Sequence, residues 1–374
     1  MVCLFWAAVQ LAEWIEMRAK AKIKLCIFML VTALLYLGHG AFFSKVYDIL
    51  PLSDTIYCMA NLAVFPLYNF YIKEVTGTEK ENVVTCYALW LAPSLLIGIG
   101  VGTAYAIMMK EGTAMLFFET YLYKNSCDGL HGWALAQCYL HIAARIIFAF
   151  IVPTVFALGY KEIKAYNTDI EAFYADTNDK KFSYSREILV LFITTCIISF
   201  VANIIGRERF GSSVWLIMIP SHTFSSLLFM LGYAGHKISF QPQEQPPSLS
   251  AFSGEQASEE SDQIEQLRYR IESLMEKERL YLQPELKVSD VAKYMSTNRD
   301  YIYQAINVKM GVSFSKYVNK KRVEHAKKLL QDTPSISMRD LSISSGFNSQ
   351  ASFYRNFKLH TGISPQKYLN SMEP

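Results

Sequence analysis

Three polar side chains recur at intervals of four residues inside an apolar stretch of the chain. In the segment QCYLHIAARIIF these are Gln137, His141 and Arg145, and this spacing places them on one face of a helix. An arginine near the middle of a membrane-spanning helix is costly unless it faces a partner or water. The stripe is therefore expected to point into a helix bundle, as a ligand-sensing site or as a polar clamp between helices, unless the span boundary is misplaced.

Polar residues in other apolar segments are candidates to join this stripe. His39 and Asn61 lie in earlier segments and His222 in a later one, while Glu119 or Glu187 is the expected counter-charge of the arginine. The seven cysteines, at positions 3, 26, 58, 86, 127, 138 and 196, contain no CxxC pair. They indicate neither a zinc site nor a redox motif, so we expect no metal and no cofactor.

Signatures of catalysis are missing from the sequence. The chain has no HExxH motif of a zinc protease, and Ser212 and Ser213 have no serine-protease context. The glycines between 98 and 102 lie in an apolar segment and do not follow a strand, so close helix packing explains them better than a nucleotide-binding loop. The sequence therefore favours a protein that is not an enzyme.

A second group of residues suited to chemistry lies near the C-terminal end, where the chain repeats itself. GVSFSKYVN at 311–319 is followed by GISPQKYLN at 362–370, and each copy follows a helix, a short break and a second helix, at 290–311 and 340–362. Asn298 and Asn348 are expected to cap the second helices, and Gly311 and Gly362 to end them. This pattern predicts two helix-turn-helix units.

The second helix of each unit has one apolar and one polar face. Arginine and glutamine are suited to the edges of guanine and adenine, whereas lysines and helix N-termini hold phosphates. The candidate DNA-binding residues are Arg299, Asp300, Tyr303 and Gln304 in the first unit, and Asn348, Gln350, Ser352, Tyr354, Arg355 and Lys358 in the second. A helix over 319–331 is expected to join the units and to fix the distance between the two recognition helices.

The elements that carry these residues differ sharply along the chain. Of the 374 residues, 52% are apolar and 18% charged, and long apolar runs end by position 237. Segments near 2–17, 25–43, 55–73, 83–108, 133–157, 188–205 and 213–235 read as six or seven membrane spans. Lysine and arginine are richer in the loops after the first, third and fifth segments, which places the region after 237 in the cytoplasm of a multi-pass protein of the bacterial inner membrane.

These patterns divide the chain into four parts. We predict a transmembrane helical domain with a sensing role over 1–237, a disordered linker over 238–263, a lead-in helix over 264–282, and a DNA-binding domain over 283–374. The lead-in helix has apolar residues at heptad spacing, so it either packs on the domain that follows or forms a homodimer. From 283 onward basic residues outnumber acidic ones, which indicates double-stranded DNA as a partner or a lysine-rich soluble surface.

The C-terminal quarter resembles a known family. VAKYM, the glycine and phenylalanine of SSGFNSQASFYRNFK, RVEHAKKLL and TGISPQKYL make residues 281–370 similar to the DNA-binding domain of AraC/XylS transcription regulators. The resemblance implies an all-helical domain with two helix-turn-helix units on one linker helix. Two positions depart from the family pattern: Ser342 replaces the usual alanine in the second unit, and Ile306-Asn307 replaces the usual Phe-Lys in the first. Because Asn307 removes an expected phosphate contact, the first unit is the weaker expected DNA reader.

The fold class expected from the whole sequence is all-α: a bundle of six or seven transmembrane helices followed by a double helix-turn-helix domain. With this arrangement, the chain resembles the membrane-embedded members of the AraC/XylS family. The favoured function is a sequence-specific transcription regulator in the lipid bilayer that responds to an unidentified small-molecule or membrane signal. The alternatives are a transporter or channel with a DNA-binding tail, and a membrane tether for DNA.

Overall fold

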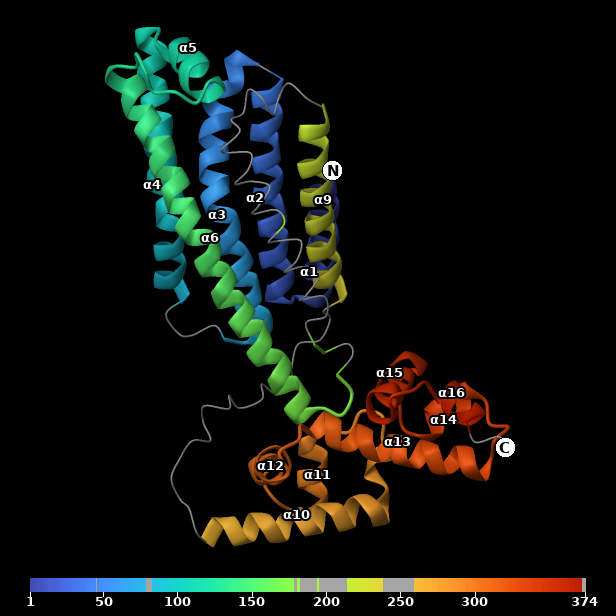
Figure 1. Ribbon diagram of the computed structural model, residues 1–374. Coiled ribbons are helices and arrows are strands. Elements are labelled where there is room, and N and C mark those ends of the chain that lie inside the picture. The colour runs from blue at the N-terminus through green and yellow to red at the C-terminus, as the bar shows by residue number, and fades with distance from the viewer. Residues whose placement is uncertain are drawn as a thin grey trace. The chain divides into compact units, whose positions relative to one another are not determined.

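The chain folds into two compact units made of helices. The computed structural model describes residues 1–44, 46–78, 83–177, 180, 181, 194, 214–237 and 259–371. Unit 1 comprises Met1–Lys164 and Tyr184–Ser239, and unit 2 comprises Ala165–Ser183 and Phe240–Pro374 (Figure 1). Within the described residues the only extended pairing is an isolated antiparallel bridge between Tyr174 and Lys287.

Unit 1 is a bundle of long helices. Its elements are α1 (Val2–Met17), α2 (Lys20–Phe43), the 3-10 turn η1 (Tyr47–Ile49), α3 (Leu50–Thr76), α4 (Val83–Glu111), α5 (Ala114–Phe117), the π turn η2 (Phe118–Tyr123), α6 (Gly132–Phe173) and α9 (Val214–Lys237). Helix α6 ends in unit 2, to which Ala165–Phe173 belong. Neighbours pack in the order α1, α2, α3, α4, and α9 packs against α1 (Figure 1).

Four segments of the described chain are long and apolar enough to cross a membrane. They are Lys20–Phe43, Tyr47–Thr76, Thr85–Glu111 and Gly132–Phe173. Helix α1 has only 16 residues, fewer than the roughly 20 that a span needs. The segment predicted at 188–205 lies outside the described residues, so a count of six or seven spans is not confirmed.

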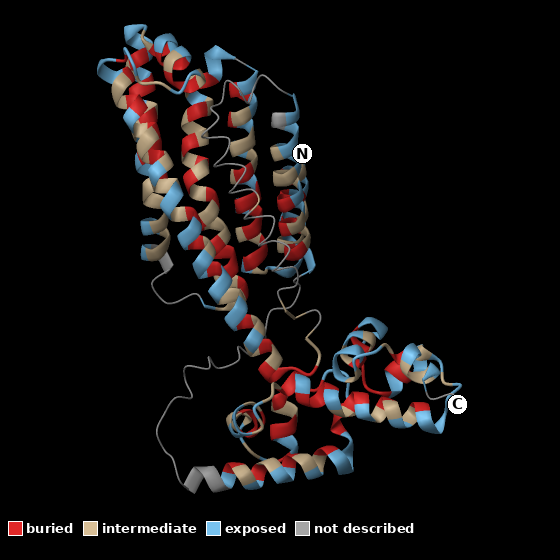
Figure 2. Ribbon diagram, viewed as in Figure 1, coloured by how far each residue is buried: buried red, intermediate tan, exposed pale blue. Residues whose placement is uncertain are grey.

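Large apolar side chains cover the outside of this bundle as well as its inside. On α4, Leu89, Leu96 and Ile99 are 74%, 69% and 66% exposed, and Phe150 on α6 is 72% exposed. Figure 2 shows these exposed stretches alternating with buried ones along both helices. An apolar exterior of this kind is costly in water and favourable in a lipid environment.

Helix packing inside unit 1 depends on close approach between α3 and α4. A side chain at Gly98 would lie 2.1 Å from the Met59 side chain, well inside normal contact. A larger residue at this crossing would require the Met59 side chain to move, which agrees with the close helix packing expected from the glycines of α4.

Unit 2 contains two small helical cores joined by one long helix. Its elements are the end of α6, α10 (Glu259–Glu278), η4 (Leu280–Leu282), α11 (Val288–Tyr294), α12 (Arg299–Tyr303), the π turn η5 (Gln304–Lys309), α13 (Phe314–Asp332), α14 (Met338–Ser344), α15 (Gln350–Thr361) and α16 (Pro365–Asn370). Helix α13 takes part in both cores, because Phe314 and Val318 belong to the first and Ala326 and Leu330 to the second.

The first core includes two segments that lie outside the DNA-binding domain expected from the sequence. Ile264, Ile271 and Met275 of α10 are buried in it, so this helix packs on the domain that follows. Ile170 and Phe173, at the end of α6, are buried in the same core. The predicted linker over 238–263 falls mostly on residues 238–258, which lie outside the described part of the chain.

Candidate nucleic-acid interface

The second helix-turn-helix unit consists of α14 and α15. Ser337 and Ser349 cap the two helices by accepting hydrogen bonds from Asp340 N and Ser352 N. The expected N-cap, Asn348, lies one residue earlier in the chain. Gly346 in the turn has φ 82°, and a Cβ there would lie 2.7 Å from the Cα of Leu282. Only glycine fits this turn, because both the backbone conformation and the close neighbour exclude a side chain.

Helix α15 presents a polar face built from some of the expected residues. Its apolar face buries Phe353 and Phe357 against Leu330 and Leu341. Gln350, Arg355 and Lys358 are exposed, as is Asn348 just before the helix. Tyr354 is half-buried, and Ser352 is only 5% exposed, so the expectation that Ser352 lies on the polar face is wrong.

In the first helix-turn-helix unit, the residues expected to contact DNA are less accessible. Arg299, Asp300 and Gln304 are half-buried. Tyr303 is 6% exposed and stacks on Phe173 of α6, with ring centroids 5.4 Å apart and an interplanar angle of 13°. The expected exposure of Tyr303 is wrong because the end of α6 covers it. A contact between Tyr303 and DNA would require this stack to open.

Asn307 explains part of the departure from the family pattern in the first unit. Its side-chain Nδ2 donates to the carbonyl oxygen of Ala172 at 3.3 Å, and its Oδ1 accepts from the Phe314 amide at 3.2 Å. The asparagine therefore connects the end of α6 to the start of α13. A lysine at this position could not accept the second of these hydrogen bonds.

Arg322 connects α13, the helix between the two helix-turn-helix units, to the segment between α10 and α11. It is 1% exposed, and its guanidinium donates to the carbonyl oxygens of Tyr281 at 2.6 Å, Gln283 at 2.7 Å and Pro284 at 3.2 Å. Burial lowers the pKa of Arg322 to about 10, which still leaves it charged at neutral pH. This role could not be predicted from the sequence, because RVEHAKKLL has the pattern of an ordinary basic helix.

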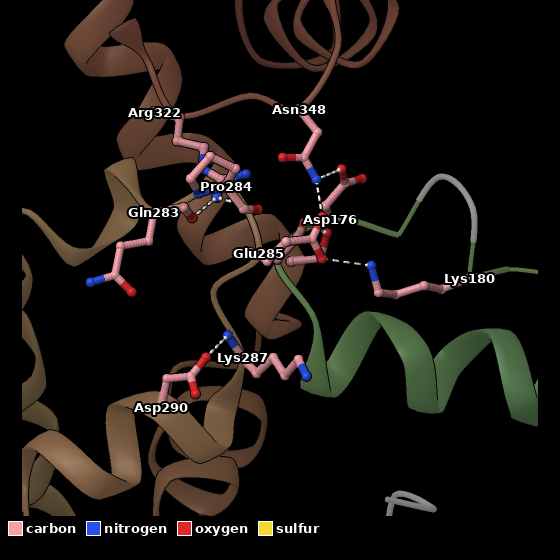
Figure 3. Close-up of polar contacts among 11 residues, drawn as sticks. Asp176, Lys180, Gln283, Pro284, Glu285, Lys287, Asp290, Arg322 and Asn348 are labelled. Carbon is pink, nitrogen blue, oxygen red and sulfur yellow. Dashed lines mark hydrogen bonds and ion pairs between the residues drawn. The ribbon is translucent and has the colours of Figure 1, made fainter. Parts of the chain in front are cut away.

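A cluster of polar side chains surrounds Asn348 at the start of α15 (Figure 3). Its Nδ2 donates to Asp176 Oδ2 at 2.6 Å and also to Glu285 Oε1. Lys180 pairs with the other oxygen of Glu285 at 3.0 Å. Burial alone would raise the pKa of Glu285, but hydrogen bonds from Lys180 and Asn348 outweigh it and hold the pKa below its ordinary value. Two carboxylates thus lie where a recognition helix normally meets phosphate.

The polar stripe expected in the membrane half divides into two parts. Gln137 and His141 are buried, at 0% and 5% exposure. Arg145 is instead half-buried, donates to Asn125 Oδ1 at 2.9 Å and lies 5.3 Å from the Tyr121 ring centroid. The acidic partner of His141 is Asp54 on α3, with Nε2 and Oδ2 2.7 Å apart. Sequence reasoning missed Asp54 because it placed the start of that span at residue 55.

Comparisons with known proteins agree with the geometry of unit 2. Residues 291–371 match the helix-turn-helix domain family. The melibiose operon regulatory protein of Escherichia coli strain K12 is 32% identical over 83 residues, which are 22% of this chain and 27% of the relative. An uncharacterized HTH-type transcriptional regulator of Staphylococcus aureus is 26% identical over 133 residues, which are 36% of this chain and 16% of the relative. No solved structure matches the chain.

The C-terminal region is therefore a helix-turn-helix domain of the kind found in DNA-binding transcription regulators. More particularly, it is a domain of the AraC type, as the resemblance in its sequence implied. The matched region is less than a quarter of the chain for the first relative, so it describes unit 2 and not the helices of unit 1.

Proposed function

We propose that the protein is a membrane-embedded, sequence-specific transcription regulator whose helical bundle responds to a signal and controls the AraC-type domain. The observation that carries this proposal is helix α6. Its first part supplies Gln137 and His141 to the interior of unit 1, and its last residues supply Phe173 and Ile170 to the core of unit 2. The same helix is therefore structural in both parts of the chain.

Two further observations support a place in the bacterial inner membrane with unit 2 in the cytoplasm. The four long apolar segments have exposed apolar side chains suited to lipid. Cys127 and Cys138 form a disulfide with Cα atoms 6.3 Å apart, and disulfides are typical of oxidising compartments. The positive loops assign this disulfide to the side opposite the cytoplasm.

The residues that directly follow α6 are well placed to transmit a change to the DNA-binding domain. The Ala175 carbonyl oxygen accepts from Ser315 Oγ at 3.0 Å and from Asn319 Nδ2 at 3.1 Å, both on α13. The Ala175 amide donates to the Leu286 carbonyl oxygen at 3.0 Å. A shift or rotation of α6 would therefore act directly on the helix that joins the two DNA-reading units.

The contacts of Asp176 suggest what such a shift would change. In the present arrangement Asp176 and Glu285 hold Asn348, and Phe173 covers Tyr303. Both contacts oppose DNA binding, because carboxylates repel phosphate and a covered tyrosine cannot reach a base. This arrangement is the resting state in our proposal, and withdrawal of 165–177 produces the DNA-binding state.

The first test is genome-wide occupancy of the full-length protein in its own cells, beside Arg355→Ala. Discrete occupied sites that vanish in the variant support a sequence-specific regulator. Diffuse occupancy that the variant leaves unchanged would contradict it and favour a membrane tether.

The second test addresses the link through α6. Phe173→Ala removes the stack on Tyr303, and Tyr160→Ala is its control, because this tyrosine of the same helix is 46% exposed. We expect Phe173→Ala to change the occupancy of target sites while Tyr160→Ala leaves it as in the wild type. Equal occupancy in all three proteins would refute the role of α6. Loss of solute uptake in either variant, with occupancy unchanged, would favour a transporter.

A further inference from the structure

Three side chains with metal-binding atoms meet inside unit 1. Asp54 and Cys58 are four residues apart on α3, and His141 faces them from α6. The three are between 4% and 5% exposed, and one ligand atom from each lies within 4.8 Å of the others. The sequence did not indicate this cluster, since His141 follows Cys58 by 83 residues and lies on a different helix.

We propose that Asp54, Cys58 and His141 bind a divalent transition-metal ion, with Zn²⁺ as the preferred ion. Thiolate, imidazole and carboxylate are the ligands that zinc prefers, at bond lengths of about 2.0–2.3 Å. Donor atoms around a tetrahedral ion are then about 3.3–3.8 Å apart, as follows from those lengths. The present separations need only small side-chain movements to reach that geometry.

The hydrogen bonds of His141 prepare it for this role. Its Nδ1 lies 2.9 Å from the Gln137 carbonyl oxygen, which can only accept, so Nδ1 carries a proton. Nε2 then faces Asp54 at 2.7 Å. A backbone carbonyl on the far nitrogen is the usual way in which proteins orient a metal-binding histidine. Nε2 is therefore the atom available to an ion.

The charge of the cluster also suits a divalent cation. In the ion-free arrangement Asp54 accepts from His141 Nε2 and from the Tyr105 hydroxyl at 2.7 Å. Binding would displace the proton on His141 Nε2 and the proton of the Cys58 thiol, releasing both to solvent. The carboxylate and thiolate then carry two negative charges, which the ion neutralises in a place where an unpaired charge is costly.

Two features around the cluster point to a ligand and not only to a clamp between helices. Gln137 is fully buried beside the Tyr105 hydroxyl, yet neither of its amide atoms forms a hydrogen bond of normal geometry with the described residues. A small pocket lined by Gly38, His39, Phe42, Leu50, Asp54 and Tyr57 reaches Asp54 from α2. An ion could enter by this pocket, and Gln137 or water could complete its coordination.

This inference deepens the proposed function, because the ion would be the signal that the bundle detects. Its binding step, however, can be tested without DNA. Full-length protein in lipid nanodiscs is stripped with a chelator and titrated with Co²⁺, which reports a thiolate ligand through a charge-transfer absorption band. Zn²⁺ is then added to displace the cobalt. The variants are Cys58→Ser and, as control, Cys26→Ser, which alters another buried cysteine of the same bundle that forms no disulfide.

We expect one equivalent of Co²⁺ with a thiolate band in the wild type and in Cys26→Ser, and full displacement by Zn²⁺. Cys58→Ser should lose the band and bind at least tenfold more weakly, while its melting temperature without metal stays that of the wild type. Absence of the band in the wild type, or a band of equal strength in Cys58→Ser, would overturn the metal site. Neither result would bear on Arg355-dependent DNA occupancy, so the proposed function would be judged separately.

Discussion

The contact between Asp176 and Asn348 leads to a quantitative prediction about DNA affinity. Asp176→Asn keeps the size of the side chain but removes its charge. In the structure Asp176 Oδ2 accepts from Asn348 Nδ2 at 2.6 Å, and Asn348 must leave this contact before it can turn to DNA. We therefore expect the variant to bind its target DNA more tightly than the wild type.

The expected gain has two parts. The exposed hydrogen bond between Asn348 and Asp176 stabilises the present arrangement by about 0.5–1.5 kcal/mol. Replacing the carboxylate with a neutral amide removes roughly half of that free energy. A carboxylate about 7 Å from a phosphate in water costs about 0.6 kcal/mol, less with salt. Together these terms amount to about 1 kcal/mol, or roughly fivefold in Kd. Because Glu285 still holds Asn348, a larger gain requires Glu285→Gln as well.

The assay is fluorescence anisotropy with a labelled target duplex and full-length protein in nanodiscs, since residues 165–177 must be present. Glu171→Gln is the matched control, because it removes one negative charge from the same segment but from a pair with Lys181. Asp176→Asn on an Asn348→Ala background should keep only the salt-sensitive part of the gain. Equal or weaker binding by Asp176→Asn, or an equal gain in Glu171→Gln, would show that the contact between Asp176 and Asn348 does not oppose DNA binding.

Three further predictions concern unit 2. Arg355→Ala should weaken binding by about 1–3 kcal/mol at one base pair and relax specificity there, which a panel of single-substituted duplexes measures; uniform affinity loss across the panel would identify a phosphate contact instead. Arg322→Lys should lower the free energy of unfolding by about 2 kcal/mol, because an ammonium cannot donate to all three carbonyl oxygens. Denaturant titrations measure this change, and the control Lys321→Arg in the same helix should leave the free energy of unfolding nearly unchanged. The lowered pKa of Glu285 means that its contribution to stability is present above the ordinary glutamate range and is lost as pH falls through the lowered value. Glu285→Gln should therefore lower the stability between pH 6 and 8, where the wild-type carboxylate is charged, and flatten the acid limb of the stability profile.

Local patterns in the sequence were sufficient for the domain that reads DNA. The repeated helix, break and helix units, the glycine and phenylalanine of the turn at 346–347 and the apolar spacing of α15 predicted a double helix-turn-helix domain, and the comparisons confirm that type. These signals are local because a turn and an amphipathic helix are specified by neighbours within about four residues. The exposed positions of Gln350, Arg355 and Lys358 follow from the same periodicity.

The apolar runs of the first half could also be recognised from local sequence. The residues at which their helices begin could not. The span expected to begin at 55 begins at Leu50 in the structure, which brings Asp54 into the helix. Boundaries are hard to place from composition because a helix can extend past its apolar part whenever a partner satisfies the polar residues there. His141 is that partner for Asp54, 87 positions away.

Local sequence patterns therefore indicated the long helices among the described residues, several of their apolar faces and the class of domain at the C-terminal end. Only the tertiary structure decided that residues 165–177 belong to the core of that domain, that Phe173 covers Tyr303, and that Asp54, Cys58 and His141 meet. The physical reason is that these contacts join segments far apart in the chain, where side-chain shape and hydrogen-bond partners select the match and local periodicity carries no record of it.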